Sequence, residues 1–323
     1  MLDLLNPYAC AVRTRNWLYD KRLIRPCKLP VPVLSVGNLS VGGSGKSSLV
    51  RYMGELLKGL HVCILSRGYG RKTKGTILVS ERGKLLVDWD EAGDEPYMLA
   101  KLLPRASVVV DEDRCRGAFF ALEKLRPDIF VLDDGFQHRR IHRDLNILLL
   151  KKRDFSDRLL PFGRLREPLS SMERADIIVL SYTDIEDLDW RHNTKPTFKM
   201  VRENWKVVRS SDGKVLEDFK EVSFIAFAGL GDNSQFFKSL ERLGIKTKER
   251  LSLPDHYSYK DFKLKEDELY ITTLKDVIKL KPSENLFYLD FDVRVDGLEG
   301  VIKGMVQKHE KKRENKIPFV YMD

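Results

Sequence analysis

Cysteine is scarce in this sequence, and long hydrophobic runs are absent. The 323 residues include four cysteines, Cys10, Cys27, Cys63 and Cys115, and none of them belongs to a C-x-x-C pair. Scattered cysteines of this kind predict reduced thiols in a reducing compartment and no zinc site. No apolar run approaches the roughly 18 to 20 residues of a spanning helix, and the N-terminus lacks the features of a signal peptide. We therefore expect a soluble or peripheral protein.

The sequence also lacks internal repeats, low-complexity tracts and any known nucleic-acid-binding module. Hydrophobic residues make up 42% of the chain, which is enough for packed cores, and the length suits two domains of ordinary size. The formal net charge of +9 is compatible with nucleic acid, an anionic membrane surface or phosphorylated substrates. Because the basic residues are scattered, we expect no nucleic-acid partner.

The stretch at 31–48, VPVLSVGNLSVGGSGKSS, predicts a strand, a glycine-rich loop and a helix N-terminus. Backbone N–H groups in such a loop bind phosphates, the lysine reaches the β and γ oxygens, and the next hydroxyl binds Mg²⁺. Ser40 stands where the usual G-x-x-x-x-G-K-[ST] pattern has its first glycine. A glycine-rich turn with a chance lysine is the alternative, which the flanking strand and helix disfavour. The predicted phosphate-binding residues are Ser40, Val41, Gly42, Gly43, Ser44, Gly45, Lys46, Ser47 and Ser48.

A second polar element follows the apolar strand predicted at 128–132, which ends in Asp133-Asp134-Gly135. An acidic residue in this position, downstream of a P-loop, is typical of a Walker B element that holds Mg²⁺. Further strands at 62–66, 107–111, 145–150 and 176–181 alternate with helices, which predicts an α/β fold with a mostly parallel sheet. Ligands of such sheets bind at the carboxyl ends of the strands, where these polar motifs fall.

The N-terminal residues 3–25 predict a helix with apolar positions at helical spacing, basic residues around it and Trp17 near the middle. Such a helix can lie in a membrane interface or pack on the core with a solvated basic face, and these residues alone leave both open. A polar stretch from residue 183 places a domain boundary near 190–205. We divide the chain into the helix (1–25), a P-loop domain (26–195) and a smaller α/β domain (196–323).

The smaller domain is expected to contain strands at 224–228 and 286–293, a further strand that ends at 251–253, and helices at 233–243 and 297–314. Three short motifs, two of them in the P-loop domain, do not by themselves indicate a function. The turn Arg67-Gly-Tyr-Gly-Arg71 could hold a phosphate or be a surface turn, and Asp94 in a first helical turn is an ordinary complement of the helix dipole. The pair Asp255-His256 follows a strand, where a lone histidine is usually incidental.

Together these motifs resemble the tetraacyldisaccharide 4′-kinase family, the lipid A 4′-kinases of Gram-negative bacteria. The matching stretches, over about 35–275, are VGNLSVGGSGK, LSRGYGR, GDEP, DDGFQHR, GRLREPLS, ERAD, AFAGLG and LPDHYSY. The resemblance implies a P-loop NTPase-like fold with helices on both faces of the sheet, and a cleft to which the smaller domain contributes. It also implies that ATP, with Mg²⁺, phosphorylates the 4′-hydroxyl of tetraacyldisaccharide 1-phosphate, which gives lipid IVA.

The resemblance also assigns roles to residues. Asp94 would act as the base, because a carboxylate can orient a sugar hydroxyl and accept its proton, and His256 would pair with it. Lys46 and Arg166 would neutralise the transferring phosphoryl group. The implied metal site comprises Ser47, Asp133, Asp134, Gln137 and Glu167. The implied substrate-binding residues are Arg67, Tyr69, Arg71, Arg114 and His138.

The implied partners are the lipid substrate and an anionic membrane surface, with a monomer bound peripherally at the cytoplasmic face of the bacterial inner membrane. This setting favours the interfacial interpretation of the first helix. The alternative function is a P-loop GTPase or metallochaperone-type NTPase. That class reads guanine with an [NT]-K-x-D motif, and the stretch Thr273-Leu-Lys-Asp276 has the wrong order. A non-enzymatic membrane protein would leave the P-loop and the acidic pair without a role.

Overall fold

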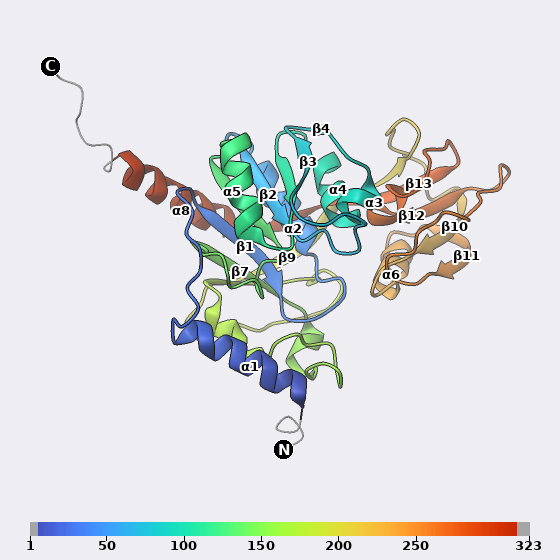
Figure 1. The fold of residues 1–323 in the computed structure, drawn as a ribbon. Coiled ribbons are helices and arrows are strands. Elements are labelled where there is room, and N and C mark those ends of the chain that lie inside the picture. Colours follow the sequence, from blue (N-terminus) through green and yellow to red (C-terminus); the bar gives the residue numbers. More distant parts are fainter. Residues whose placement is uncertain (1–5, 315–323) are drawn as a thin grey trace.

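The computed structural model describes residues 6–314, which form two lobes joined by one sheet (Figure 1). The strand order is β11-β10-β12-β13-β9-β8-β7-β1-β6-β2-β5-β3-β4. In the first lobe the parallel strands are β1 (Val33–Asn38), β2 (Val62–Ser66), β5 (Ser107–Val110), β6 (Ile129–Asp133), β7 (Leu145–Leu150) and β8 (Ile177–Leu180). Two antiparallel strands, β3 (Ile77–Glu81) and β4 (Lys84–Leu85), complete its edge.

Helices cover both faces of this sheet, because alternate strand residues are buried on opposite sides. One face packs on α2 (Lys46–Leu56), α4 (Asp94–Leu102) and α8 (Leu298–Glu314), preceded by the short α3 (Trp89–Ala92) before α4. The other face packs on α5 (Arg114–Lys124) and, through Ala9, on α1 (Pro7–Asp20). The predicted α/β fold with a mostly parallel, doubly covered sheet is confirmed. None of the described helices is long and apolar enough to span a bilayer.

The second lobe contains the parallel strands β10 (Ser223–Ala228), β11 (Lys246–Ser252), β12 (Tyr270–Thr273) and β13 (Leu286–Val295), with α6 (Ser234–Arg242) and α7 (Leu274–Val277). The long β9 (Thr197–Arg209) pairs with β8 at its start and then runs antiparallel to β13. The last helix, α8, packs against the core of the first lobe. The division at residues 195 and 196 therefore stays a prediction, since β9 and α8 tie the two parts together.

Two elements differ in extent from the sequence expectations. The first helix runs only from Pro7 to Asp20, because the Asn6 side chain caps its start and Arg22 adopts a φ of 58° just after its end; residues 3–5 of the expected helix lie outside the described residues. The other is strand β11, which runs from Lys246 to Ser252: its end at 251–253 is confirmed, and its start was not predicted. It is an edge strand whose polar side chains are mostly exposed, so it has no apolar pattern.

The expectation of free thiols is wrong for one pair of cysteines. Cys27 and Cys115 form a disulfide that links the segment before β1 to the first turn of α5. Cys27 also forms an isolated β-bridge with Ile141, which holds it beside this helix. The two cysteines are 88 residues apart in sequence, and no local pattern reveals such a contact. Cys63 is buried with a free thiol.

Candidate active site

The P-loop lies between β1 and α2 at the carboxyl ends of the parallel strands. Gly42 and Gly45 have φ angles of 93° and 79°, which only glycine adopts at little cost. Ser40 is buried and forms an isolated antiparallel bridge with Leu165. It has no positive φ, which explains why this position does not need glycine. All nine predicted phosphate-binding residues line a cavity of about 960 Å³ between the lobes.

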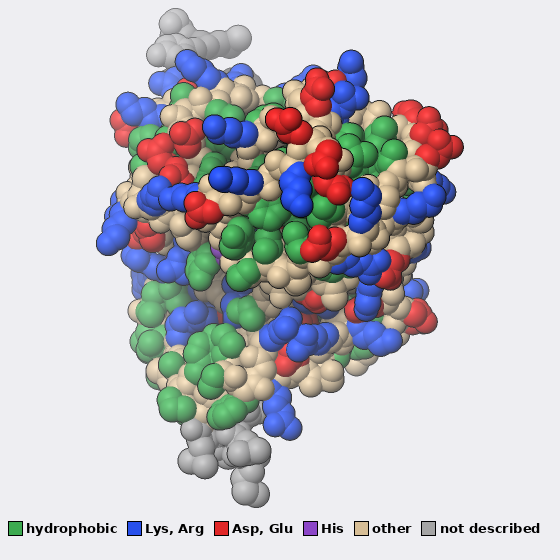
Figure 2. Space-filling view, turned by 90° about the vertical axis from the view of Figure 1, so that its right-hand side faces the viewer, with side chains coloured by type: hydrophobic (Ala, Val, Ile, Leu, Met, Phe, Trp, Pro, Cys, Tyr) green, Lys and Arg blue, Asp and Glu red, His purple; other side chains and the backbone are tan. Residues whose placement is uncertain are grey.

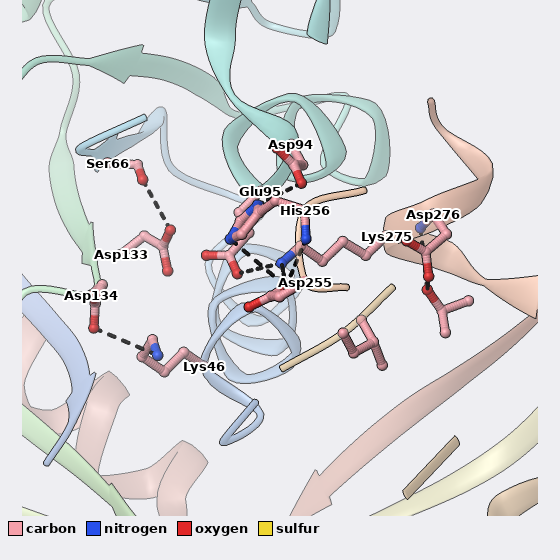
Figure 3. A network of polar contacts seen from close by, with 12 residues as sticks. Lys46, Ser66, Asp94, Glu95, Asp133, Asp134, Asp255, His256, Lys275 and Asp276 are labelled. Atoms are coloured by element: carbon pink, nitrogen blue, oxygen red, sulfur yellow. Dashed lines mark hydrogen bonds and ion pairs between the residues drawn. The ribbon is translucent and has the colours of Figure 1, made fainter. Parts of the chain in front are cut away.

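The acidic pair at the end of β6 faces this loop (Figure 3). Asp133 is buried and accepts a hydrogen bond from the Ser66 hydroxyl at 3.0 Å, while its Oδ1 has no partner among the described residues. Burial, together with the nearby Glu95 and Asp134, raises the pKa of Asp133 to about 7. A buried carboxylate oxygen without a donor beside a P-loop fits a place for a cation.

The surroundings of Asp134 favour its ionised form, in contrast to those of Asp133. Burial opposes its ionisation, but Lys46 and Arg166 outweigh burial and hold the pKa of Asp134 well below its usual range. Arg166 donates to both carboxylate oxygens, at 2.7 and 2.8 Å. Lys46 Nζ lies 3.6 Å from Asp134 Oδ1 and donates to Asn38 Oδ1 at 3.2 Å, an oxygen to which Arg166 also donates. Two cations are thus held beside the phosphate loop.

The structure separates the other two expected metal ligands. The Gln137 amide donates to the Asn38 carbonyl at 2.8 Å, close to the P-loop, and its own oxygen is buried and has no partner within residues 6–314. Glu167 differs from expectation, because its fully buried carboxylate faces α1 instead. It accepts hydrogen bonds from Arg15 at 2.6 Å and from Asn16 at 3.0 Å, and it forms an ion pair with Arg174 at 2.6 Å.

No group of three or more His, Cys, Asp or Glu side chains that could hold a metal converges within residues 6–314. A cation beside Asp133 would therefore take further ligands from the hydroxyl of Ser47, at the first turn of α2, and from a bound nucleotide or water. Glu167 is not available for this role, since its oxygens are engaged by the two arginines and the asparagine.

Asp94 and His256, 162 residues apart in sequence, meet across the lobes (Figure 3). His256 Nδ1 lies 2.9 Å from Asp94 Oδ2, and the same oxygen lies 2.7 Å from Lys279 Nζ. Burial opposes ionisation of Asp94, but the hydrogen bonds from His256 and Lys279 outweigh it and hold its pKa below the usual range. His256 lines the cavity and Asp94 lies behind it. The expected contact is present, and the catalytic roles of the two residues stay predictions.

The five expected substrate-binding residues do not form one cluster. Arg67 and the exposed Tyr69 line the cavity, and the Tyr69 ring lies 5.3 Å from that of His256. Arg71 does not line the cavity. Its side chain is 3% exposed and binds Glu112 and the Gly75 carbonyl, so it stabilises the loop to which it belongs.

Neither Arg114 nor the half-buried His138 lines the cavity. Arg114 is buried, and burial lowers its pKa to about 10. Burial and the charge of Arg114 lower the pKa of His138 to about 4, and His138 Nε2 has no partner among the described residues.

Three lysines at the site were not singled out from the sequence. Lys279 contacts Asp94, Lys275 lies 3.5 Å from Glu95, and the buried Lys151 donates to the P-loop carbonyl of Gly43 at 3.1 Å. Lysine is common in this chain, and only the fold shows which lysines are buried. Position at a strand end was the one available signal, and it applied to Lys151 just after β7.

Comparison with known proteins agrees with this arrangement. The family model described as tetraacyldisaccharide-1-P 4′-kinase matches residues 2–308. The tetraacyldisaccharide 4′-kinase of Aquifex aeolicus is 58% identical over 297 residues, which cover 92% of this chain and 94% of that protein. The enzyme of the same name from Syntrophus aciditrophicus is 37% identical, with 89% and 87% covered.

A solved structure is similar as well. The crystal structure of LpxK from Aquifex aeolicus in complex with ATP matches with a TM-score of 0.85 and 56% identity, and the match covers 94% of this chain and 96% of that one. The residues 2–308 matched by the family model include the P-loop, the acidic pair and the strands of the second lobe. The chain belongs to the tetraacyldisaccharide 4′-kinase family.

Proposed function

We propose that this protein transfers the γ-phosphate of ATP to the 4′-hydroxyl of a tetraacyldisaccharide 1-phosphate, with Mg²⁺ bound at Asp133 and Ser47. The observation that carries the proposal is the Asp94–His256 pair, which faces the P-loop across one cavity. Family membership supplies the substrate class, since the relatives are named as kinases of this lipid. The ATP complex of the Aquifex aeolicus relative supports the choice of nucleotide.

In this reaction the 4′-oxygen forms a bond to the γ-phosphorus while the bond from that phosphorus to the β–γ bridging oxygen breaks, and ADP leaves. The proton of the hydroxyl passes to the Asp94–His256 pair. Lys46 and Arg166 stabilise the charge on the transferring group, because both are cations fixed beside the phosphate loop. Mg²⁺ held by Asp133 and Ser47 would neutralise part of the negative charge of the phosphates.

The test measures transfer of labelled phosphate from ATP to tetraacyldisaccharide 1-phosphate in detergent micelles. We expect transfer by the wild type, and losses of about 10²- to 10⁴-fold in Asp94→Ala and His256→Ala with ATP binding retained. Asp261→Ala is the control, because Asp261 is exposed on the second lobe. ATP hydrolysis that proceeds without the lipid, or a fully active His256→Ala, would overturn the assignment.

We also propose that α1 and its neighbouring loop rest on an anionic membrane at the cytoplasmic face of the inner membrane. Trp17, Leu23 and Phe162 expose 52%, 64% and 68% of their surface. Phe162 lies near the start of α1, because the carbonyl of Leu160, two residues before it, accepts a hydrogen bond from Asn6, the residue that caps α1. Arg13, Lys21, Arg22 and Arg25 are exposed nearby. Figure 2 shows hydrophobic side chains gathered at the lower end of the molecule, where α1 lies in Figure 1. Apolar anchors with basic flanks suit an anionic interface.

Sedimentation with vesicles containing anionic lipid tests this part separately. We expect Trp17→Glu combined with Leu23→Glu to reduce vesicle binding while activity in micelles remains. Phe119→Glu is the matched control, because Phe119 is also half exposed but lies on α5. Equal loss of binding in the control would contradict α1 as the membrane-facing element.

A further inference from the structure

Lys279 is a buried lysine beside the proposed catalytic pair. Its side chain is 1% exposed, and its ammonium lies 2.7 Å from Asp94 Oδ2, 3.3 Å from the Tyr257 carbonyl oxygen and 5.8 Å from the centre of the Tyr259 ring. Taking an ammonium out of water costs several kcal/mol unless a counter-ion compensates. The compensating carboxylate belongs to the other lobe, so this lysine is satisfied only while the lobes are together.

Two donors from the second lobe therefore converge on one oxygen of the first lobe. His256 and Lys279 both approach Asp94 Oδ2, and Asp94 sits in the first turn of α4. Lys275, one helical turn before Lys279, lies 3.5 Å from Glu95 and 3.4 Å from Asp255 (Figure 3). Residues of α7 and of the segment just after it thus engage both carboxylates at the start of α4.

We propose that Lys279 is a positioning residue for phosphoryl transfer, which fixes the Asp94 carboxylate behind His256 when the lobes meet. The inference rests on the proposed function. With Lys279 in place, Asp94 carries a full negative charge that holds the Nδ1 proton of His256, so that Nε2 of the ring faces the cavity. Without it, Asp94 is free to rotate or to take up a proton, and the histidine loses its orientation.

The charges around Asp94 set the direction of the expected pH effect. The groups that face it are His256, Lys279 and Lys275, which favour its ionised form, and burial opposes them. Removing the charge of Lys279 leaves burial less opposed, so the pKa of Asp94 rises. The enzyme works with Asp94 ionised, and activity is lost as the pH falls through that pKa. The acid limb of the rate profile therefore moves to higher pH in a variant without this charge.

The experiment compares the dependence of kcat on pH from 5 to 9 for wild type, Lys279→Met and Lys279→Arg in the micelle assay. We expect kcat of Lys279→Met to fall at least tenfold below wild type at pH 6, with the gap narrowing towards pH 9, and Lys279→Arg to recover most of it. Lys281→Met is the control, because Lys281 is exposed two residues away, and its profile should match wild type.

Urea unfolding and ATP binding are measured on each variant. If Lys279→Met folds and binds ATP, and its profile of kcat against pH is parallel to that of wild type, the proposal is overturned. If Lys279→Met does not fold, the same profile is read on Lys279→Gln, whose amide keeps a donor for the Tyr257 carbonyl. An unshifted acid limb there overturns the proposal equally. A wild type that transfers no phosphate to the lipid would instead refute the proposed function.

Discussion

Replacing Glu167 by glutamine distinguishes a structural anchor from a metal ligand. Glu167 is fully buried, and burial favours its neutral form, but Arg174 and Arg15 outweigh burial and hold its pKa below the usual value. Its stabilising effect is therefore present above the unfolded-state pKa of about 4.3 and lost as the pH falls below it. Because Arg15 belongs to α1, this carboxylate fastens the helix to the first lobe.

The size of the effect follows from the partners that the substitution would leave behind. Removing one member of a buried ion pair costs about 3–5 kcal/mol. Arg15 is 39% exposed and recovers some hydration, while Arg174 is only 16% exposed and retains the Phe136 ring at 4.6 Å. We therefore expect the lower end, about 3 kcal/mol, or roughly 4–5 °C in Tm for a chain of this length. The difference from wild type should narrow below about pH 4.

The assay combines urea unfolding with titration of activity against Mg²⁺. Glu167→Gln should lower the urea midpoint and leave the Mg²⁺ concentration for half-maximal activity within about twofold of wild type, since a lost anchor weakens folding and not metal binding. Glu173→Gln is the matched control: Glu173 is 65% exposed and should cost under about 0.5 kcal/mol. A tenfold rise in the Mg²⁺ requirement with an unchanged urea midpoint would refute the anchor and restore Glu167 as a ligand.

Three further predictions concern other contacts. In Gly37→Ala the new methyl carbon would lie 2.5 Å from a side-chain carbon and 2.6 Å from a backbone nitrogen of the loop after β6, so we expect about 3 kcal/mol of lost stability in urea unfolding. Arg166→Lys loses the bidentate contact with the Asp134 carboxylate, so kcat should fall about 10²-fold. Calorimetry should show an ATP affinity within a few-fold of wild type. Serine at both Cys27 and Cys115 opens a link across 88 residues and should cost about 4–5 kcal/mol; dithiothreitol should lower the Tm of wild type and leave that of the double variant unchanged.

Local patterns were sufficient for the first lobe. The apolar strands, the glycines of the P-loop and the acidic residues after β6 are all properties of short segments, so their positions follow from periodicity and turn chemistry. Because parallel strands bring their carboxyl ends to one edge, the meeting of Lys46 with Asp134 was also predictable. Edge strand β11 escaped this reasoning, since its exposed side chains leave no apolar alternation.

Pairings between distant charged residues could not be predicted in this way. Arg71 and Glu167 belong to motifs of the site, yet each is satisfied by a partner that the motif does not contain. Lys279 lies in a lysine-rich stretch whose sequence predicts a solvated surface. Its burial depends on Asp94, which is distant in sequence and belongs to the other lobe. The spacing of residues within a motif indicates which chemistry is possible. The contacts between distant charged residues decide which of these side chains remain available to take part in that chemistry.

The contacts across the cavity also indicate how such a site limits hydrolysis of ATP. They are ion pairs and close backbone approaches: Asp94 meets Lys279, and a Cβ on Gly231 would lie 3.1 Å from Gly42 Cα in the P-loop. Polar contacts of this kind separate more readily than an apolar interface, because water solvates both partners once they part. We propose that in an open state the P-loop keeps its lysine but loses His256, so that water near the phosphates has no assembled proton acceptor. On this proposal the pair is complete only on closure, which would tie phosphate transfer to the presence of a substrate large enough to hold both lobes.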